Sequence, residues 1–342
     1  DTITLPGGVE VSVVLPGQIY QDTLVLRENG ERVSDYRISI ADSQSLVQWQ
    51  SASGSALREI TLEYLLSGIS WTPKYDMWLE QGTASGASDA AESQDAVEEM
   101  VEFDFFTEIQ NRVLSLEDVD VKLVAGRVDT SRQVDSVSMV TANQIMVGYE
   151  QPGPADSPVG AANIQYVYEV AGISADPGDT IYTSLKETQL PARRVLFWNA
   201  PADDQVKVIY KMRNESALPF AEGIVRAYQN DLFLGSDFIE LTPIGSEGSI
   251  TVGNLQDVRV SREETRTAVG GPSEQDTQHD VELKLTNFSD QQVKIDIVDQ
   301  YPANGINFSF SNEPELQGGN LFRWQVEMQP GETVTITYRF RS

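Results

Sequence analysis

The clearest alternation of apolar and polar residues lies in Val9-Glu10-Val11-Ser12-Val13 near the beginning of the chain and in Val281-Glu282-Leu283-Lys284-Leu285 near its end. In both, apolar and polar residues alternate with a period of two, which is the pattern of a strand with one buried face. Helical periodicity is nearly absent from the rest of the sequence. We therefore expect strands along the whole chain.

Other segments repeat this pattern and are rich in Val, Ile, Thr and aromatic residues, which favour strands. They are 58–66, 118–124, 164–170, 205–212, 293–298 and 333–340. Turn sequences separate them, namely Pro6-Gly7-Gly8, Asn29-Gly30, Asp176-Pro177-Gly178-Asp179, Asn304-Gly305 and Pro330-Gly331-Glu332. Short strands joined by turns predict an all-β protein made of antiparallel β-sandwiches, with an immunoglobulin-like sandwich at the C-terminus.

Two polar stretches interrupt the alternation. Residues 82–97 predict a long surface loop, or a short helix over 94–100, and residues 262–277 predict a linker that contains Gly270-Gly271-Pro272. The predicted division is a small N-terminal β unit (1–57) packed on a main β-sandwich (58–271), followed by a C-terminal sandwich (272–342). Open edges at 2–15 and 333–341 are candidates for pairing with a neighbouring sheet.

The charge of the chain excludes several partners. With 52 acidic and 24 basic residues in 342, the net charge of −28 repels nucleic acid and anionic bilayers. The basic residues are mostly Arg, which suits high salt or a cation-rich exterior, although a saline cytoplasm gives the same bias. No apolar run approaches the roughly 20 residues that a membrane helix needs. We expect neither a nucleic-acid partner nor a membrane-spanning segment.

The N-terminus and the glycosylation sequons favour an exported protein. Asp1-Thr2-Ile3-Thr4-Leu5 has neither an initiator Met nor a signal sequence, which predicts a processed, mature end; a deliberately shortened chain is the alternative. Three N-x-S sequons make Asn214, Asn287 and Asn307 candidates for glycosylation. We expect an extracellular or cell-surface location.

Catalytic patterns are missing from the sequence. The chain has no cysteine, which removes thiolate nucleophiles and Cys-based metal sites, and its one histidine, His279, is expected to be exposed at the start of a strand. No G-x-S-x-G motif or phosphate-binding loop is present. Paired carboxylates for glycoside hydrolysis are the remaining enzymatic alternative, with candidates Glu98, Glu99, Glu102 and Asp104. A solvated acidic face explains these better, and we predict no enzymatic activity.

Calcium is the one cofactor that the acidic turns suggest, because carboxylates and carbonyls are its preferred ligands. The weak candidates share a position at turns between strands, and they are Asp176, Asp179, Asp203 and Asp204. No loop matches the EF-hand pattern, so ordinary turn residues are the leading interpretation and no other cofactor is expected.

At Ser70-Trp71-Thr72-Pro73-Lys74-Tyr75-Asp76 the chain resembles the domain of unknown function 4139 family, which is related to the C-terminal part of mucoidy inhibitor A homologues. Matching features follow in order along roughly residues 58–342. They are Ile109-Gln110-Asn111, Asp118-Val119, Leu123-Val124-Ala125-Gly126, Tyr168-Glu169-Val170, Ala227-Tyr228-Gln229, Leu234-Gly235-Ser236, Asn287, Asp299-Gln300-Tyr301-Pro302, Trp324 and Pro330-Gly331-Glu332. The coiled-coil segment of longer members is absent here.

The resemblance implies a β-sandwich architecture and brings no established activity or catalytic residue. Within the first motif, we expect Trp71 and Tyr75, evenly spaced about Pro73, to anchor a core at an edge strand; a platform for stacking sugars is the alternative. The leading functional hypothesis is an exported structural protein of a cell-surface layer, sheath or filament that associates with itself. The alternatives are a monomeric adhesin or glycan-binding module of the envelope, and a carboxylate-based hydrolase.

Overall fold

The computed structural model describes residues 2–5, 10–15, 19–41, 44–51, 58–79, 98–125, 166–269 and 276–342. Within these ranges every regular element is a strand, so the predicted all-β class is confirmed. Accordingly, this part of the chain contains no helix that is long and apolar enough to cross a membrane. The predicted loop at 82–97, the turn Pro6-Gly7-Gly8 and the sequence Gly270-Gly271-Pro272 lie outside the described residues. Residues 98–100 are strand rather than the end of a helix.

The chain forms two compact units, and each unit is assembled from separate segments of sequence. The first contains Asp1–Lys74, Phe106–Val124 and Val167–Leu185, and the second contains Tyr75–Phe105, Ala125–Tyr166 and Lys186–Ser342. Strands β8 (Ile69–Leu79), β9 (Glu98–Asn111) and β12 (Thr180–Asn199) contribute residues to both units. The predicted three consecutive domains stay a prediction, with different bounds from these units.

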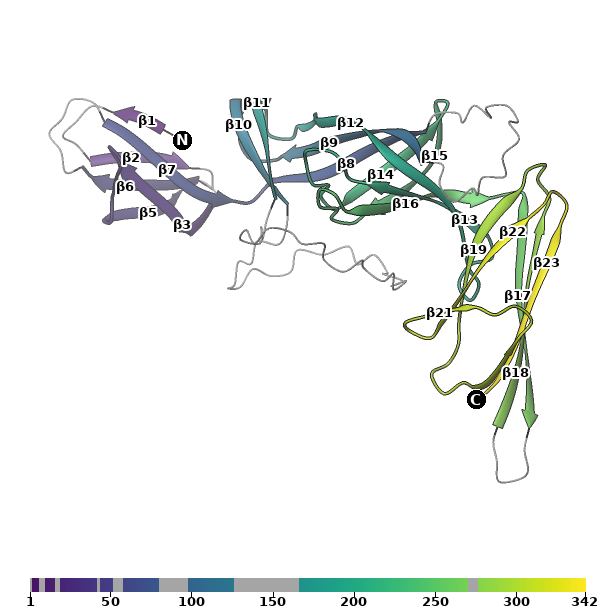
Figure 1. The fold of residues 1–342 in the computed structure, drawn as a ribbon. Helices are drawn as coiled ribbons and strands as arrows, with labels where there is room; N and C mark the ends of the chain where they lie inside the picture. The colour runs from purple at the N-terminus through teal and green to yellow at the C-terminus, as the bar shows by residue number, and fades with distance from the viewer. Residues whose placement is uncertain are drawn as a thin grey trace. The chain divides into compact units, whose positions relative to one another are not determined.

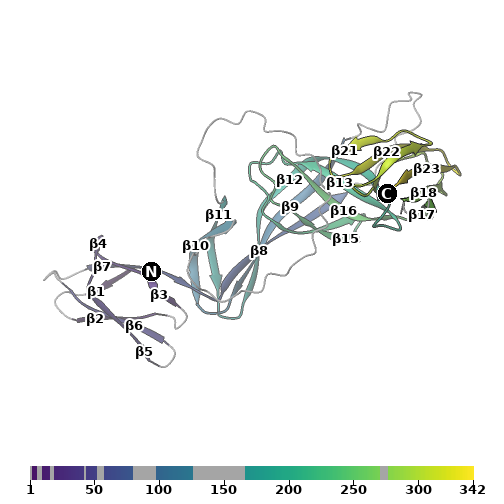
Figure 2. The ribbon, with the colours of Figure 1, turned by 90° about the horizontal axis from the view of Figure 1, so that it is seen from below.

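The first unit begins with a two-layer sandwich (Figures 1 and 2). One sheet has the order β1 (Thr2–Leu5), β7 (Arg58–Leu66), β3 (Ile19–Glu28), β4 (Glu31–Arg32), and the other β2 (Glu10–Leu15), β6 (Gln44–Gln50), β5 (Tyr36–Ala41). The alternating residues of these strands meet in one core of Val11, Val13, Leu15, Ile19, Leu24, Leu26, Val47, Trp49, Ile60 and Leu62. Strand β7 therefore belongs to this sandwich although it follows residue 57. Strands β10 (Leu116–Ala125) and β11 (Tyr166–Ala175) form a separate two-stranded sheet.

The second unit contains most of a ten-stranded sheet. Its order is β15-β14-β8-β9-β12-β19-β22-β21, and β13 pairs with β12 and β16. The strands not yet given are β13 (Val206–Arg213), β14 (Gly223–Gln229), β15 (Leu232–Ile239), β16 (Glu247–Leu255), β19 (Val293–Gln300), β21 (Glu315–Gln317) and β22 (Leu321–Met328). Strand β16 lies beside β15, because Thr251 N donates to Asp237 Oδ2 at 2.6 Å.

Strand β8 carries the first family motif, and β14 and β9 flank it in the sheet order, so it is not the edge strand that the proline suggested. Tyr75 is fully buried, stacks on Phe103 and Phe105 with centroids 5.2 and 4.6 Å away, and donates its hydroxyl hydrogen to Ala221 O at 2.8 Å. Trp71 is half-buried and donates from Nε1 to Val124 O at 3.2 Å. Both aromatic residues therefore anchor packing, as expected.

The C-terminal part of the second unit is a sandwich. One layer is β17 (Val258–Val269), β18 (Asp276–Asn287), β23 (Thr333–Arg341) and β20 (Ile306–Phe310), in that order, and the core joins it to β12, β19 and β22 (Figure 1). This core also includes Leu196, Trp198 and Val206, which come from upstream of the predicted boundary. The end of β12 pairs with β19 in parallel, from Leu196↔Ile295 to Asn199↔Val298, which departs from a purely antiparallel arrangement.

One expectation for this region is wrong, and a second holds for only part of a strand. The stretch predicted as a linker is largely strand, because β17 pairs with β18 from Val258↔Asn287 to Val269↔Asp276. Its inward positions include Arg262 and Glu264 instead of apolar residues, so the sequence shows no apolar alternation there. The predicted open edge at 333–341 is confined to the first part of β23, because β18 pairs with one edge of the whole strand and β20 pairs with the other edge from Tyr338 to Arg341.

Candidate functional site

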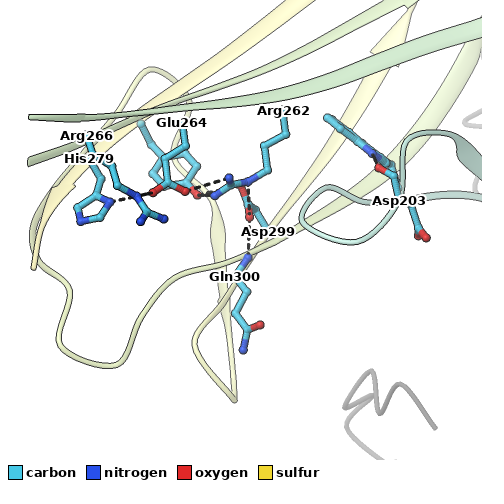
Figure 3. Close-up of polar contacts among 9 residues, drawn as sticks. Asp203, Arg262, Glu264, Arg266, His279, Asp299 and Gln300 are labelled. Carbon is cyan, nitrogen blue, oxygen red and sulfur yellow. Dashed lines mark hydrogen bonds and ion pairs between the residues drawn. The ribbon is translucent and has the colours of Figure 1, made fainter. Parts of the chain in front are cut away.

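A buried polar network lies inside the C-terminal sandwich, on the inward faces of β17, β18, β19 and β23 (Figure 3). It starts at Asp299, which follows Ile295 and Ile297 on the buried face of β19 and is 0% exposed. Arg262 Nε donates to Asp299 Oδ1 and Oδ2 at 3.1 and 2.9 Å. Tyr338 donates its hydroxyl hydrogen to Oδ2, and Gln300 N donates to Oδ1, both at 2.8 Å. Both carboxylate oxygens are thus hydrogen-bonded.

The network continues from Arg262 along β17 to β18. Arg262 Nη1 donates to Glu264 Oε2 at 3.0 Å, and Arg266 Nε donates to Glu264 Oε1 at 2.7 Å. His279 Nδ1 lies 2.9 Å from the same Oε1 atom. Because an ionised carboxylate can only accept, Nδ1 carries the hydrogen. Two carboxylates are therefore balanced by two guanidinium groups.

Burial and pairing set the electrostatics of these groups. Burial raises the pKa of Asp299, and Arg262 and the Tyr338 hydroxyl counteract this only in part. Burial also acts to raise the pKa of Glu264, but hydrogen bonds from His279, Arg266 and Arg262 outweigh it and lower the pKa to about 2. Tyr338 has a raised pKa because it is buried and lies beside the Asp299 carboxylate.

His279 is buried, which contradicts the predicted exposed position. It is 8% exposed, and its ring stacks on Phe340 with centroids 4.4 Å apart and planes 6° from parallel. Its Nε2 lies 2.8 Å from Ser342 Oγ. The sequence places His279 in a polar context, but its position at an inward point of β18 opposite Phe340 makes it a core residue.

Ser342, His279 and Glu264 therefore have the connectivity of a catalytic triad, in which an acid orients the histidine and the histidine activates the serine. Acyl transfer also requires an oxyanion hole, to which the backbone N–H of the nucleophile commonly contributes. Here Ser342 N donates to Thr277 O at 3.0 Å as part of the strand pairing. That donor is occupied, so the geometry fits a structural network better than a hydrolase.

A second kind of polar centre occurs three times among the residues that the structure describes, and we call it the asparagine lock. It consists of a fully buried Asn at the end of a strand and a facing turn with a glycine at positive φ, in the pairs Asn111/Gly178, Asn214/Gly245 and Asn287/Gly331. In each lock the glycine N donates to the asparagine backbone O, at 2.7, 2.7 and 2.9 Å respectively. The asparagine N donates back to the residue after the glycine, at 2.9, 2.8 and 2.9 Å.

The side chain completes each lock. Asn287 Nδ2 donates to Gln291 O at 2.8 Å and to Gln329 O at 3.1 Å, and its Oδ1 accepts from Ser289 N and Ser289 Oγ. Asn214 repeats this pattern with Leu218 O, Thr242 O and Ser216. Asn111 donates to the carbonyls of Ala175 and Asp176 and accepts from Val113 N and Leu114 N.

The locks change the interpretation of two sequons. Asn214 and Asn287 are 0% exposed and use both side-chain atoms for hydrogen bonds, so a glycan at either nitrogen is incompatible with the folded arrangement. In these sequons the serine is part of the lock, where it donates to the asparagine oxygen. Asn307 is exposed and has a φ of 57°, and its glycosylation stays a prediction.

The calcium candidates divide between the two units. Asp176 and Asp179 lie in the turn that faces Asn111, where Ser115 Oγ donates to Asp176 Oδ1 and Asp176 N donates to Asp179 Oδ2, both at 2.8 Å. Asp203 pairs with Lys207 at 2.8 Å and lies apart from the network in Figure 3. Asp204 is exposed. Among the residues that the structure describes, no three His, Cys, Asp or Glu side chains gather in a way that could hold a metal.

The acidic residues of β9 surround a further carboxylate. Burial raises the pKa of Asp104, and Glu102, Glu187 and Asp76 add to this by repulsion. Glu98 and Glu102 are exposed, whereas Glu99 and Asp104 are half-buried, so two of the four candidate acids are solvated. Sequence reasoning found these residues but not Glu187 or Asp76, which the sheet brings near from other strands.

Comparison with protein families gives one match. The family described as "Domain of unknown function (DUF4139)" matches residues 60–342, which is most of the chain, and the protein therefore belongs to that family. No curated protein matches the chain. No solved structure matches it either. Several positions that suggested the family, among them Asn111, Asn287, Asp299 and Gly331, are parts of the locks and of the polar network.

Proposed function

We propose that this chain is a non-catalytic, exported structural protein of a cell-surface layer, sheath or extracellular filament, which associates with itself through its sheets. The network around Asp299 supports the non-catalytic part, because its groups bind one another and leave the reacting geometry of a triad incomplete. The acidic, lysine-poor surface supports an exterior rich in cations.

The observation that carries the proposal is an outward sheet surface on β8, β14 and β15, which we call the aromatic face. It consists of Trp78, Ile224, Tyr228, Phe233 and Phe238. Ile224 and Phe238 are directly opposite each other and are 41% and 51% exposed. Phe233 is 52% exposed, and its ring lies 5.6 Å from Tyr228. Clustered exposed apolar side chains of this kind mark protein interfaces.

The polar residues on the aromatic face are fixed in place. Arg226 donates from Nε and Nη2 to the two carboxylate oxygens of Asp76, both at 2.7 Å. This bidentate pair lies between the Ile224–Phe238 pair and the stacked rings of Trp78 and Tyr228, whose centroids are 4.5 Å apart. A rigid surface of this composition loses little side-chain entropy when a partner binds.

Light scattering after size-exclusion chromatography tests the proposal. The wild-type protein is expected to form large assemblies once salt or calcium reduces the repulsion between subunits of charge −28. Phe238→Glu is expected to reduce these assemblies, whereas the control Leu316→Glu, at a 69% exposed site on β21, is expected to leave them unchanged. A wild-type protein that stays monomeric in chelator, in sodium chloride and in calcium contradicts the proposal. Microscopy of native cell surfaces for a regular array tests the location.

The alternative is a monomeric envelope adhesin or glycan-binding module, and the row Trp78–Tyr228–Phe233 beside Asp104 favours it, because sugars bind aromatic rings next to carboxylates. However, Trp78 and Tyr228 stack on each other with planes 19° apart, which covers one face of each ring. Calorimetric titration with oligosaccharides decides the matter. Binding that disappears in Trp78→Ala while the protein stays monomeric favours the adhesin.

A further inference from the structure

Strand β17 is the last strand of its sheet. The order is β17-β18-β23-β20, and β18 covers one edge of β17 over all twelve residues, Val258–Val269. Among the described residues no strand pairs with the other edge of β17. Half of its backbone N–H and C=O groups therefore point toward an open edge, which is a template for pairing with another strand.

The charges of β17 differ from those of the chain as a whole. The strand has three arginines and two glutamates, an excess of one positive charge, within a chain of net charge −28. Arg262 and Glu264 point inward and are compensated by Asp299, His279 and Arg266. Arg259, Ser261 and Glu263 alternate with them and are exposed on the outward face. Pairing at this edge thus leaves no buried charge without a partner.

Symmetry limits how two copies of β17 can pair. When a twofold axis perpendicular to the sheet relates two antiparallel strands, each side chain stays on the same face of the sheet in both copies. Directly opposite residues also share a face, so the axis must pass through a position where one residue lies opposite its own copy. Registers centred on Arg262, Glu263, Glu264 or Arg266 bring like charges face to face. A register centred on Thr265 reuses the Glu264–Arg266 contact that each chain already makes.

The register centred on Ser261 places opposite charges, rather than like charges, across from each other. It places Arg259 of each copy opposite Glu263 of the other, so that one contact contains two new cross-strand ion pairs on the exposed face. Opposite charges that face each other in this way stabilise antiparallel pairs, and like charges destabilise them. Arg259 also lies over the Phe288 ring, with Cζ 5.3 Å from its centroid, which orients its side chain at the surface.

We propose that two copies of this chain join their C-terminal sheets through antiparallel pairing of β17, with Ser261 on the twofold axis. This inference rests on the self-association proposed above and identifies one of its contacts. The aromatic face lies on other strands. A second twofold contact through the aromatic face, with an axis that does not meet this one, would generate an open, linear polymer, which is the arrangement that a filament or sheath requires.

A single cysteine tests the register, because the chain has no cysteine of its own. Ser261→Cys is expected to give a disulfide-linked dimer under mild oxidation, since facing Cα atoms in antiparallel strands are about 4.5–5.5 Å apart, within disulfide reach. Thr265→Cys is the matched control on the same face. In the proposed register its two copies are eight residues apart along the strands, or roughly 26 Å. Cross-linking at 265 and not at 261 overturns the proposal.

Charge exchange provides an independent test that leaves the backbone unchanged. Arg259→Glu is expected to weaken the contact roughly tenfold or more, because two attractive pairs become repulsive. The double variant Arg259→Glu with Glu263→Arg is expected to restore it, since the pairs are re-formed with exchanged signs. A double variant that associates no better than the single variant overturns the proposal, provided that circular dichroism shows both to be folded.

The outcomes separate this contact from the proposed function. Cross-linking of Ser261→Cys that persists in the Phe238→Glu background supports the β17 contact independently of the aromatic face. Absence of cross-linking at 261, with wild-type assemblies that still depend on Phe238, overturns the β17 contact alone and leaves the proposed function standing. In that case the charges of β17 protect the edge from pairing, which is their common role on open strands.

Discussion

Two polar centres in the same C-terminal sandwich satisfy buried groups in different ways. Asn287 is neutral and binds backbone atoms of a facing turn, whereas Asp299 is an acid balanced by Arg262 on another strand. Both are 0% exposed. The lock recurs at Asn111 and Asn214, but the ionic network occurs once among the described residues. The difference indicates that the neutral lock closes a turn at the ends of three strands, while the network specifies one pairing of layers.

The largest expected effect is on the ionic centre. Asp299→Ala leaves Arg262 partly buried without its carboxylate, and breaking such a pair costs about 3–5 kcal/mol of unfolding free energy. Urea denaturation measures this. The double variant Asp299→Ala with Arg262→Met is expected to recover part of the loss, because it removes the uncompensated charge. A loss below about 1 kcal/mol in the single variant shows that the pair does not hold the layers together.

Removal of one lock is expected to have a smaller effect. Asn287→Ala leaves the carbonyls of Gln291 and Gln329 and the Ser289 N–H without partners, at a cost of about 2–3 kcal/mol. Thermal or urea unfolding measures it, and Asn304→Ala, at an exposed turn position, is the control with an expected change within about 0.5 kcal/mol. If the locks are equivalent, Asn214→Ala has a similar cost. A loss no larger than the control's contradicts the proposed role.

Low pH is expected to weaken the ionic network but not the asparagine lock. The pKa of Glu264 in the folded chain is about 2, below its ordinary value of 4.5. Its ionised form therefore stabilises the fold above about pH 4.5, and this contribution is lost as the pH falls toward 2. We call the fall in unfolding free energy between about pH 4.5 and pH 2 the acid limb. We expect Glu264→Gln to lower the unfolding free energy by about 2 kcal/mol at neutral pH and to make the acid limb less steep.

Asn287→Ala should keep that acid limb, because the lock contains no titrating group. Asp280 also has a lowered pKa, through hydrogen bonds from Gln278 and Arg339, so some acid dependence remains in Glu264→Gln. The comparison needs unfolding curves for the three proteins at several pH values between 2 and 7. Parallel acid limbs for Glu264→Gln and the wild type contradict the assignment of this contribution to Glu264.

The smallest expected effect concerns Ser342. Its side chain makes a single hydrogen bond, to His279, and Ser342→Ala is expected to cost about 1 kcal/mol. A fluorophosphonate reagent, which labels activated serines, should leave Ser342 unmodified because its backbone N–H is used in strand pairing. Stoichiometric labelling at Ser342 that disappears in His279→Ala indicates an active triad and contradicts the non-catalytic interpretation.

Particular residues show which features of the fold could be predicted from the sequence. The alternation at 58–66 and 293–298 predicted strands that the structure confirms as β7 and β19. The sequons at Asn214 and Asn287 were visible, yet their role in turns was not, because each of these two locks needs a glycine turn from about 30 to 45 residues further along the chain. His279 was expected to be exposed, and Arg262 to lie in a linker, for the same reason, since their partners lie on other strands.

The all-β class, most strand positions and the turns that fall within the described residues follow from local sequence, because period-two alternation and Asn, Gly and Pro preferences act over a few neighbouring residues. The folded chain alone shows that β12 ends in the core of the C-terminal sandwich, that β17 is a strand and that Asp299 is buried beside Arg262. These features depend on which strands pair across long distances in sequence. Local periodicity carries no information about such partners.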